Sequence, residues 1–166
     1  MNKELQNKLF EKYPKIFVQK DLSPQETCMC WGISCGDGWY TLINELCADI
    51  NNRLENKNRN KPEEEHLVCQ AVQVKEKFGG LCFYIYGGDE YIDGCISMAE
   101  SISYHICTEC GNKSNSINDR GWIHSLCLSC QDSFLSKRAD ILKQDKLDPD
   151  YNAQCEPDIN VAGKKI

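Results

Sequence analysis

The sequence predicts an α+β fold, in which a small β-hairpin or sheet packs against two to three helices and carries an inserted zinc ribbon with four cysteine ligands. Apolar residues at steps of three and four over residues 37–56 indicate a long helix with one buried face. Two apolar segments, 67–77 and 81–86, flank Gly79-Gly80 and indicate a hairpin. Two Cys-x-x-Cys pairs separated by 16 residues indicate a four-thiolate metal site.

The helix over residues 37–56 has the most regular apolar pattern in the chain. Gly36 and Gly38 flank Asp37, whose side chain is expected to cap the helix N-terminus. The apolar stripe consists of Trp39, Leu42, Ile43, Leu46, Cys47, Ile50 and Leu54. Shorter helical patterns cover residues 2–13, 89–105 and 132–147.

The two strands of the predicted hairpin differ in pattern. Val72 and Val74 alternate with polar residues in the first strand, so both valines are expected to face one side. Tyr84 and Tyr86 alternate in the second strand and share a face. Packing in the core or an interface is the favoured interpretation for these tyrosines, and an aromatic platform in contact with solvent is the alternative.

Cys107 and Cys110, together with Cys127 and Cys130, are predicted to bind one structural zinc ion. Zinc prefers four soft ligands in a tetrahedron, and Gly111 follows the first pair where a knuckle favours positive φ. A redox pair fits less well, because two pairs at this separation suit one metal. A closed four-thiolate site has no open position for water or substrate, so no catalytic or cofactor-binding residue is predicted.

Other cysteines and histidines are weaker candidates for metal ligands. His105 and His124 lie near the two pairs and are expected at the surface, with replacement of a sulfur or a contact to a ligand as the alternative. A second metal site would consist of Cys28, Cys30 and Cys35, with Cys47 as the fourth ligand. Their spacing matches no ordinary knuckle, so the favoured interpretation is that they are small apolar core residues.

Composition and charge favour some classes of protein for this chain and disfavour others. The 166 residues carry a formal net charge of −6, and all of the acidic excess lies in residues 61–166. A nucleic-acid-binding protein usually presents a basic stripe, and the sequence shows none. No stretch of 18 or more apolar residues exists, so no membrane span is expected. Paired cysteines without an apolar N-terminal segment favour a reducing cytoplasm and metal binding over a disulfide framework.

The expected domain organisation follows from these patterns. Residues 1–106 would form the α+β core, and residues 107–130 the zinc ribbon. Residues 131–147 would form a C-terminal helix that packs back on the core. Residues 148–166 are polar without periodicity, so a flexible tail or docking segment is expected there.

Several strings of residues occur together and resemble a known group. They are residues 35–40 (CGDGWY), 74–81 (VKEKFGGL), Phe83-Tyr84, Met98-Ala99-Glu100, Cys107 and Cys110 with Gly111, and Trp122 before Leu126-Cys127. This combination, over residues 14–130, resembles small uncharacterised proteins of tailed-phage and prophage genomes. The position of Cys82 is usually basic in that group, and Cys28 and Cys30 are not regular features of it, which argues against a second metal. The resemblance implies an accessory role in the cytoplasm of an infected bacterium.

Three functions remain as hypotheses from the sequence. The leading one is a non-enzymatic zinc-binding protein that binds a host protein or a small ligand, with interference with bacterial defence as its purpose. The second is a nucleic-acid-binding zinc ribbon, which the acidic charge disfavours. The third is a cysteine-dependent enzyme, because a cysteine and a histidine that are distant in sequence can meet in the fold.

Overall fold

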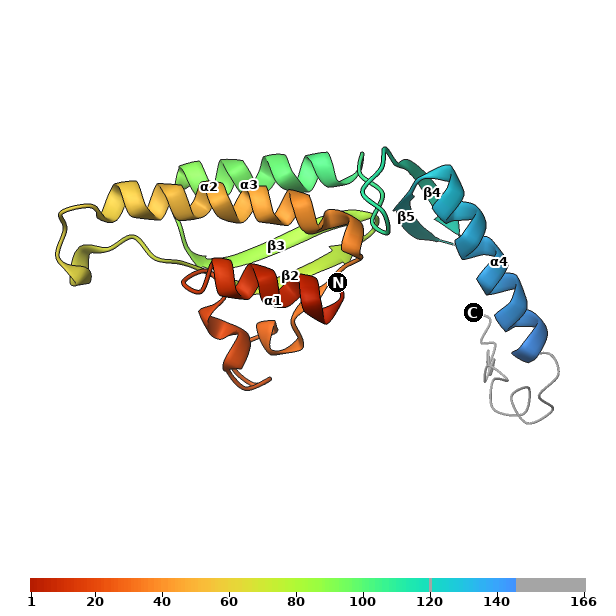
Figure 1. Cartoon of the computed structure of the whole chain (residues 1–166), viewed down its shortest axis with the longest axis horizontal. Coiled ribbons are helices and arrows are strands. Elements are labelled where there is room, and N and C mark those ends of the chain that lie inside the picture. The colour runs from red at the N-terminus through yellow and green to blue at the C-terminus, as the bar shows by residue number, and fades with distance from the viewer. Residues whose placement is uncertain (120, 146–166) are drawn as a thin grey trace, which may run out of the picture. The chain divides into compact units, whose positions relative to one another are not determined.

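The computed structural model describes residues 1–119 and 121–145, which form an α+β fold as predicted (Figure 1). The elements are α1 (Lys3–Lys12), β1 (Ile33–Ser34), α2 (Tyr40–Asn58), β2 (Cys69–Lys77), β3 (Gly80–Gly87), α3 (Glu90–Ser103), β4 (Asn115–Asp119), β5 (Trp122–Leu126) and α4 (Leu128–Asp145). Within the described residues, no helix combines the length and hydropathy needed to cross a membrane.

The central sheet has three strands in the order β1-β2-β3. β2 and β3 form the predicted antiparallel hairpin, and β1 adds a short parallel strand in which Ile33 lies opposite Val74. α2 and α3 lie side by side and cover one face of this sheet (Figure 1). A second, two-stranded sheet consists of β4 and β5 and forms the ribbon hairpin between the two cysteine pairs.

The turn between β2 and β3 lies one residue earlier than predicted. Phe78 and Gly79 occupy the turn with φ values of 53° and 80°, which is the geometry of a type I′ turn. The Glu76 carboxylate accepts a 2.6 Å hydrogen bond from the Gly79 amide and holds this turn. Gly80 belongs to β3, where a Cβ atom would lie 2.4 Å from the ring of Tyr104. A side chain at position 80 would therefore require the Tyr104 ring to move.

A β-bulge changes which residues of β2 face the core. The register shifts between Ala71 and Gln73, so Val72 has no regular partner on β3. Ala71 and Val74 are fully buried, whereas Val72 is only half-buried. The regular alternation of Val72 and Val74 that the sequence indicates is therefore interrupted by the bulge.

Side-chain caps fix the beginning of two helices close to the predicted positions. The Asn2 carboxamide oxygen accepts a 2.9 Å hydrogen bond from the Leu5 amide at the start of α1. The Asp89 carboxylate accepts a 3.2 Å hydrogen bond from the Ile92 amide at the start of α3. Both residues satisfy amides that have no partner within their helix.

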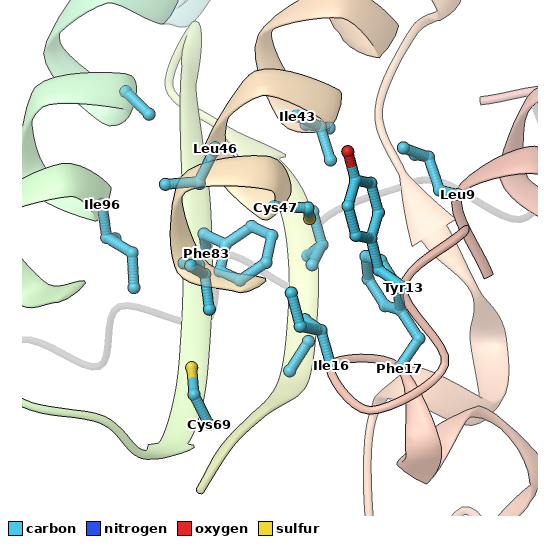
Figure 2. Close-up of a cluster of buried hydrophobic side chains, with 14 of the residues drawn as sticks. Leu9, Tyr13, Ile16, Phe17, Ile43, Leu46, Cys47, Cys69, Phe83 and Ile96 are labelled. Carbon is cyan, nitrogen blue, oxygen red and sulfur yellow. The ribbon is translucent and has the colours of Figure 1, made fainter. Parts of the chain in front are cut away.

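Side chains from α2, α3, the sheet and the N-terminal segment form one hydrophobic core (Figure 2). Tyr13 and Phe17 of the N-terminal segment reach toward Ile43 of α2, and the Tyr13 hydroxyl donates to the Asn44 carbonyl at 3.1 Å. The fully buried core residues include Leu9, Ile16, Phe17, Met29, Trp39, Ile43, Cys47, Ile50, Ala71, Val74 and Ile92. None of the four paired cysteines belongs to this core cluster.

The C-terminal part of the predicted organisation lies largely outside the described residues. Residues 146–147 of the predicted helix and the whole of the predicted tail, 148–166, are not described. The packing of a C-terminal helix on the core stays a prediction.

Candidate metal centre

The structure brings the four predicted cysteines together. The sulfur atoms of Cys107, Cys110, Cys127 and Cys130 all lie within 4.8 Å of one another, and those of Cys110 and Cys127 are 3.5 Å apart. A Zn–S distance of about 2.3 Å in a tetrahedron requires sulfurs about 3.8 Å apart. A metal ion would therefore fit between the four sulfur atoms after side-chain shifts of about 1 Å or less.

The first pair lies on a turn that follows α3. The Cys107 amide donates to the Asn112 carbonyl at 2.7 Å, and the Gly111 amide donates to the Cys107 carbonyl at 2.9 Å. Gly111 has φ of 79°, which confirms the positive φ predicted for this position. The turn is fixed by backbone groups and does not depend on the side chains between the two cysteines.

The second pair joins the end of β5 to the beginning of α4. Helix α4 starts at Leu128, four residues before the predicted start at Asp132, so Cys130 lies in its first turn. A helix N-terminus offers amides without partners in the helix, which favours thiolates there. The Thr108 amide donates to the Ser125 carbonyl at 2.9 Å and links the two pairs before any metal binds.

The glycines that precede α2 lie directly on the first pair. The Gly38 amide donates to the Thr108 carbonyl at 2.8 Å. A Cβ atom on Gly38 would lie 2.2 Å from the Cys107 carbonyl oxygen, and one on Gly36 would lie 2.2 Å from the Thr108 carbonyl oxygen. Only glycine at both positions permits this approach of backbone to backbone.

Asp37 does not cap α2, contrary to the prediction. Residues Asp37–Trp39 form a short 3-10 turn, and α2 begins at Tyr40 without a side-chain cap. The two Asp37 carboxylate oxygens accept hydrogen bonds of 2.7 Å from the Asn2 amide and the Asn2 side chain. The bond from the Asn2 amide lowers the pKa of Asp37. Asp37 therefore ties the N-terminus of the chain to the segment that supports the metal centre.

Two further hydrogen bonds join the ribbon to the core. The indole Nε1 of the fully buried Trp39 donates to the Ile106 carbonyl at 2.9 Å, immediately before Cys107. The buried Ser125 hydroxyl donates to the Gly79 carbonyl at 2.6 Å in the β2–β3 turn. These contacts hold both halves of the cysteine cluster against the core. Sequence reasoning placed Trp39 in the core correctly but missed its bond to the metal-site backbone.

The remaining predicted ligands do not join the cluster. Among residues 1–119 and 121–145, the four-cysteine cluster is the only group of three or more potential ligands whose ligand atoms lie close together. His105 is exposed and His124 is half-buried. The described residues therefore give no support to a second metal site at Cys28, Cys30 and Cys35.

The cysteines outside the cluster have different surroundings. Cys28 is exposed, so the prediction that it is a core residue is wrong, whereas Cys47 is fully buried. Burial raises the pKa of Cys35 to about 12 and that of Cys69 to about 11. A thiol with a raised pKa is a poor nucleophile near neutral pH, so neither residue is suited to covalent catalysis.

The thiols of the cluster have unequal acidity before a metal binds. A hydrogen bond from the Ser129 hydroxyl, together with one from the Cys130 amide, lowers the pKa of Cys127 to about 6. Hydrogen bonding to Cys127 and Cys110 raises the pKa of Cys130 to about 12. One thiolate is therefore ready to bind a cation near neutral pH, and the cation then favours ionisation of the others.

Comparison with known proteins does not assign a function to this site. No protein-family model, curated protein or solved structure matches the chain. Four sulfur atoms without a carboxylate or water position are typical of a closed structural metal site.

Proposed function

We propose that the chain binds one zinc ion through Cys107, Cys110, Cys127 and Cys130 and that the ion stabilises the ribbon on the α+β core. The convergence of four sulfur atoms within 4.8 Å supports this proposal. Thiolate-only sites select zinc among the common divalent ions that have no redox chemistry. The closed ligand set favours a binding protein over an enzyme.

Metal analysis of the purified chain tests the zinc proposal. We expect about one zinc per chain, and a Cys110→Ser variant should retain much less than the wild type. Cys28→Ser is the matched control, because Cys28 is an exposed cysteine outside the cluster. A zinc-free wild-type protein after expression with added zinc, or equal zinc content in both variants, would overturn the proposal. Two zinc ions per chain would contradict a single site.

The partner of this zinc protein is proposed to be a host protein or a small ligand in the cytoplasm of an infected bacterium. The resemblance to small phage proteins supports this role, and interference with bacterial defence is the purpose it suggests. Affinity capture from bacterial lysate with the zinc-loaded chain tests the role. Recovery of no host protein and no bound small molecule would count against it.

A second candidate function is binding of single-stranded nucleic acid. Tyr84 and Tyr86 are 45% and 65% exposed on β3, and the Lys75 ammonium lies 5.7 Å from the centre of the Tyr84 ring. Exposed rings beside a cation can stack bases. The net charge of −6 opposes this function. The absence of binding in a titration with a labelled oligonucleotide at low salt would exclude this function.

A further inference from the structure

Trp31 is 72% exposed, and its side chain lines a cavity far from the cysteine cluster in sequence. The cavity has a volume of about 590 Å³ and lies between α1 and the segment that leads to β1 (Figure 1). Its volume falls within the range of about 300–1,000 Å³ that is usual for small-molecule sites. We call it the Trp31 cavity and define it by Lys3, Asn7, Phe10, Glu11, Met29 and Trp31.

Hydrogen bonds on both sides of Trp31 fix its position. The Thr27 hydroxyl accepts a 3.1 Å hydrogen bond from the Met29 amide and donates to a carbonyl of β2 at 3.1 Å. After Trp31, the Ile33 amide donates to the carboxamide oxygen of Gln6 on α1 at 2.8 Å. The turn that carries the indole is therefore formed before any ligand binds, which lowers the entropic cost of binding.

One face of α1 forms the opposite wall of the cavity. Asn7 follows Lys3 by four residues, and Glu11 follows Asn7 by four, so the three side chains lie on one face. Among residues 1–119 and 121–145, these three side chains have no hydrogen-bond or ion-pair partner. At 1.5 Å per residue, the row from Lys3 to Glu11 is about 12 Å long. The wall therefore offers free donors and acceptors along this length.

The base of the cavity is apolar, in contrast to this wall. Met29 is fully buried, and the half-buried Phe10 ring packs on Phe17 with a centroid distance of 5.1 Å. The exposed indole of Trp31 adds a further apolar ring, and its Nε1–H has no acceptor in the part of the chain that the structure describes. A ligand that suits the cavity therefore combines an apolar face with polar groups at its edges.

The charges around the cavity balance. Lys20 and Asp21 also line it, and they form an ion pair with each other. The remaining charges, on Lys3 and Glu11, cancel formally. A nucleotide phosphate would meet two carboxylates as well as two lysines, so the cavity offers it no excess of positive charge. The charges of an amino acid are too close together to reach both ends of the row on α1. The lining therefore favours a neutral, polar ligand.

We propose that the Trp31 cavity binds a neutral saccharide, with one sugar ring stacked on the Trp31 indole. The C–H groups of a pyranose ring form an apolar face that suits an aromatic ring, and its hydroxyls both donate and accept hydrogen bonds. The Asn7 carboxamide likewise donates and accepts, whereas Lys3 only donates and Glu11 only accepts. The row of about 12 Å on α1 is close to the length of two linked sugar rings.

This proposal rests on the proposed binding function, because it names the chemical class of the small ligand. Titration of the full chain with cellobiose, lactose and N,N′-diacetylchitobiose tests it. Isothermal calorimetry measures affinity, and ¹H–¹⁵N NMR follows the indole N–H signal of each tryptophan. We expect a saturable shift of the Trp31 signal with at least one disaccharide and no shift for Trp39 or Trp122. Trp31→Ala should weaken binding at least tenfold, and Asn7→Ala severalfold.

Matched variants separate the cavity from non-specific binding. Trp122→Ala removes an indole that is 69% exposed on β5 and does not line the cavity, so it should bind like the wild type. Asn52→Ala, at an exposed position of α2, is the control for Asn7→Ala. Failure of the wild type to bind any of the three disaccharides, or equal losses in Trp31→Ala and Trp122→Ala, would overturn the proposal. Tighter binding of adenosine monophosphate than of every disaccharide would overturn it in favour of a nucleotide.

Zinc content, measured on the same samples, distinguishes failure of this proposal from failure of the zinc proposal. Trp31→Ala should keep the zinc content of the wild type, since Trp31 is not one of the clustered residues. Loss of disaccharide binding at unchanged zinc content supports the cavity. A wild type that holds zinc but binds no disaccharide would contradict the saccharide proposal alone. A zinc-free wild type that binds a disaccharide would contradict the zinc proposal alone and support the cavity.

Discussion

The Gly38 amide donates a 2.8 Å hydrogen bond to the carbonyl of Thr108, which lies between Cys107 and Cys110. This bond joins the segment that starts α2 to the turn that carries the first cysteine pair. The cluster cannot change shape there without moving a segment of the core. We therefore expect metal binding and core stability to be coupled.

Gly38→Ala should weaken both the fold and the metal site. The new Cβ atom would lie 2.2 Å from the Cys107 carbonyl oxygen, so the backbone must move. Such overpacking costs about 1–3 kcal/mol of unfolding free energy. Zinc affinity, measured by competition with a chromophoric chelator, should fall at least tenfold. The control is Gly94→Ala, where a Cβ atom meets nothing and stability should rise by about 0.5–1 kcal/mol. Equal effects of the two substitutions would contradict the role of Gly38.

Trp39→Phe should destabilise the chain by about 1–3 kcal/mol in urea unfolding. The substitution keeps an aromatic ring in the core but removes the Nε1–H donor, which leaves the Ile106 carbonyl without this partner. Trp31→Phe is the control, because Trp31 is 72% exposed. If the two substitutions change stability by the same small amount, the hydrogen bond from Trp39 to the Ile106 carbonyl does not stabilise the ribbon on the core.

Ser103→Ala should destabilise the chain because it leaves a buried amide without its partner. The Ser103 hydroxyl accepts a 2.8 Å hydrogen bond from the Leu81 amide of β3 and is itself fully buried. A buried donor that loses its partner costs about 1–3 kcal/mol. Ser101→Ala, at an exposed position of the same helix, should be close to neutral in the same thermal or urea unfolding experiment.

The Arg53–Asp89 pair should contribute a pH-dependent part of the stability. Partial burial acts to raise the pKa of Asp89, but hydrogen bonds from Arg53 and the Ile92 amide outweigh it and lower this pKa. The stabilisation is therefore present above the unfolded-state value of about 3.9 and is lost as pH falls through the lower folded-state value. Asp89→Asn keeps a capping oxygen and removes the charge, so it should cost about 0.5–1 kcal/mol at pH 7.

Urea unfolding of the wild type and Asp89→Asn at pH 7 and in acid measures this contribution. The difference between the two proteins should shrink in acid, because Asp89 of the wild type is then protonated. Both proteins carry the same cysteine cluster, so release of metal in acid affects them equally. A difference that stays constant or grows in acid would contradict the assignment.

Local patterns in the sequence predicted the elements whose causes are local. The hairpin, the start of a helix near residue 89 and the pairing of Cys107 and Cys110 all follow from residues a few positions apart. The same patterns failed where a distant residue decides the structure. Asp37 has the sequence context of a helix cap, but Asn2, 35 residues away, occupies both carboxylate oxygens. Helical periodicity likewise does not predict the contact of Gly38 with the first cysteine pair.

Irregular backbone is the other reason that the strands differ from the sequence-based prediction. The bulge at Val72 and the positive φ of Phe78 each move the strand pattern by one residue. Neither follows from side-chain alternation, because a non-glycine residue at positive φ is uncommon and a bulge leaves no pattern of its own. The four cysteines were assigned without these details, since zinc needs only two short turns at the right separation.

X-ray absorption at the zinc edge of the purified chain tests the proposed metal centre most directly. The spectrum should show four sulfur atoms at about 2.3 Å around each zinc ion. The Cys110→Ser variant should lose this signature, and the Cys28→Ser variant should keep it. Nitrogen or oxygen ligands at about 2.0–2.1 Å around the wild-type zinc would contradict a site made of Cys107, Cys110, Cys127 and Cys130.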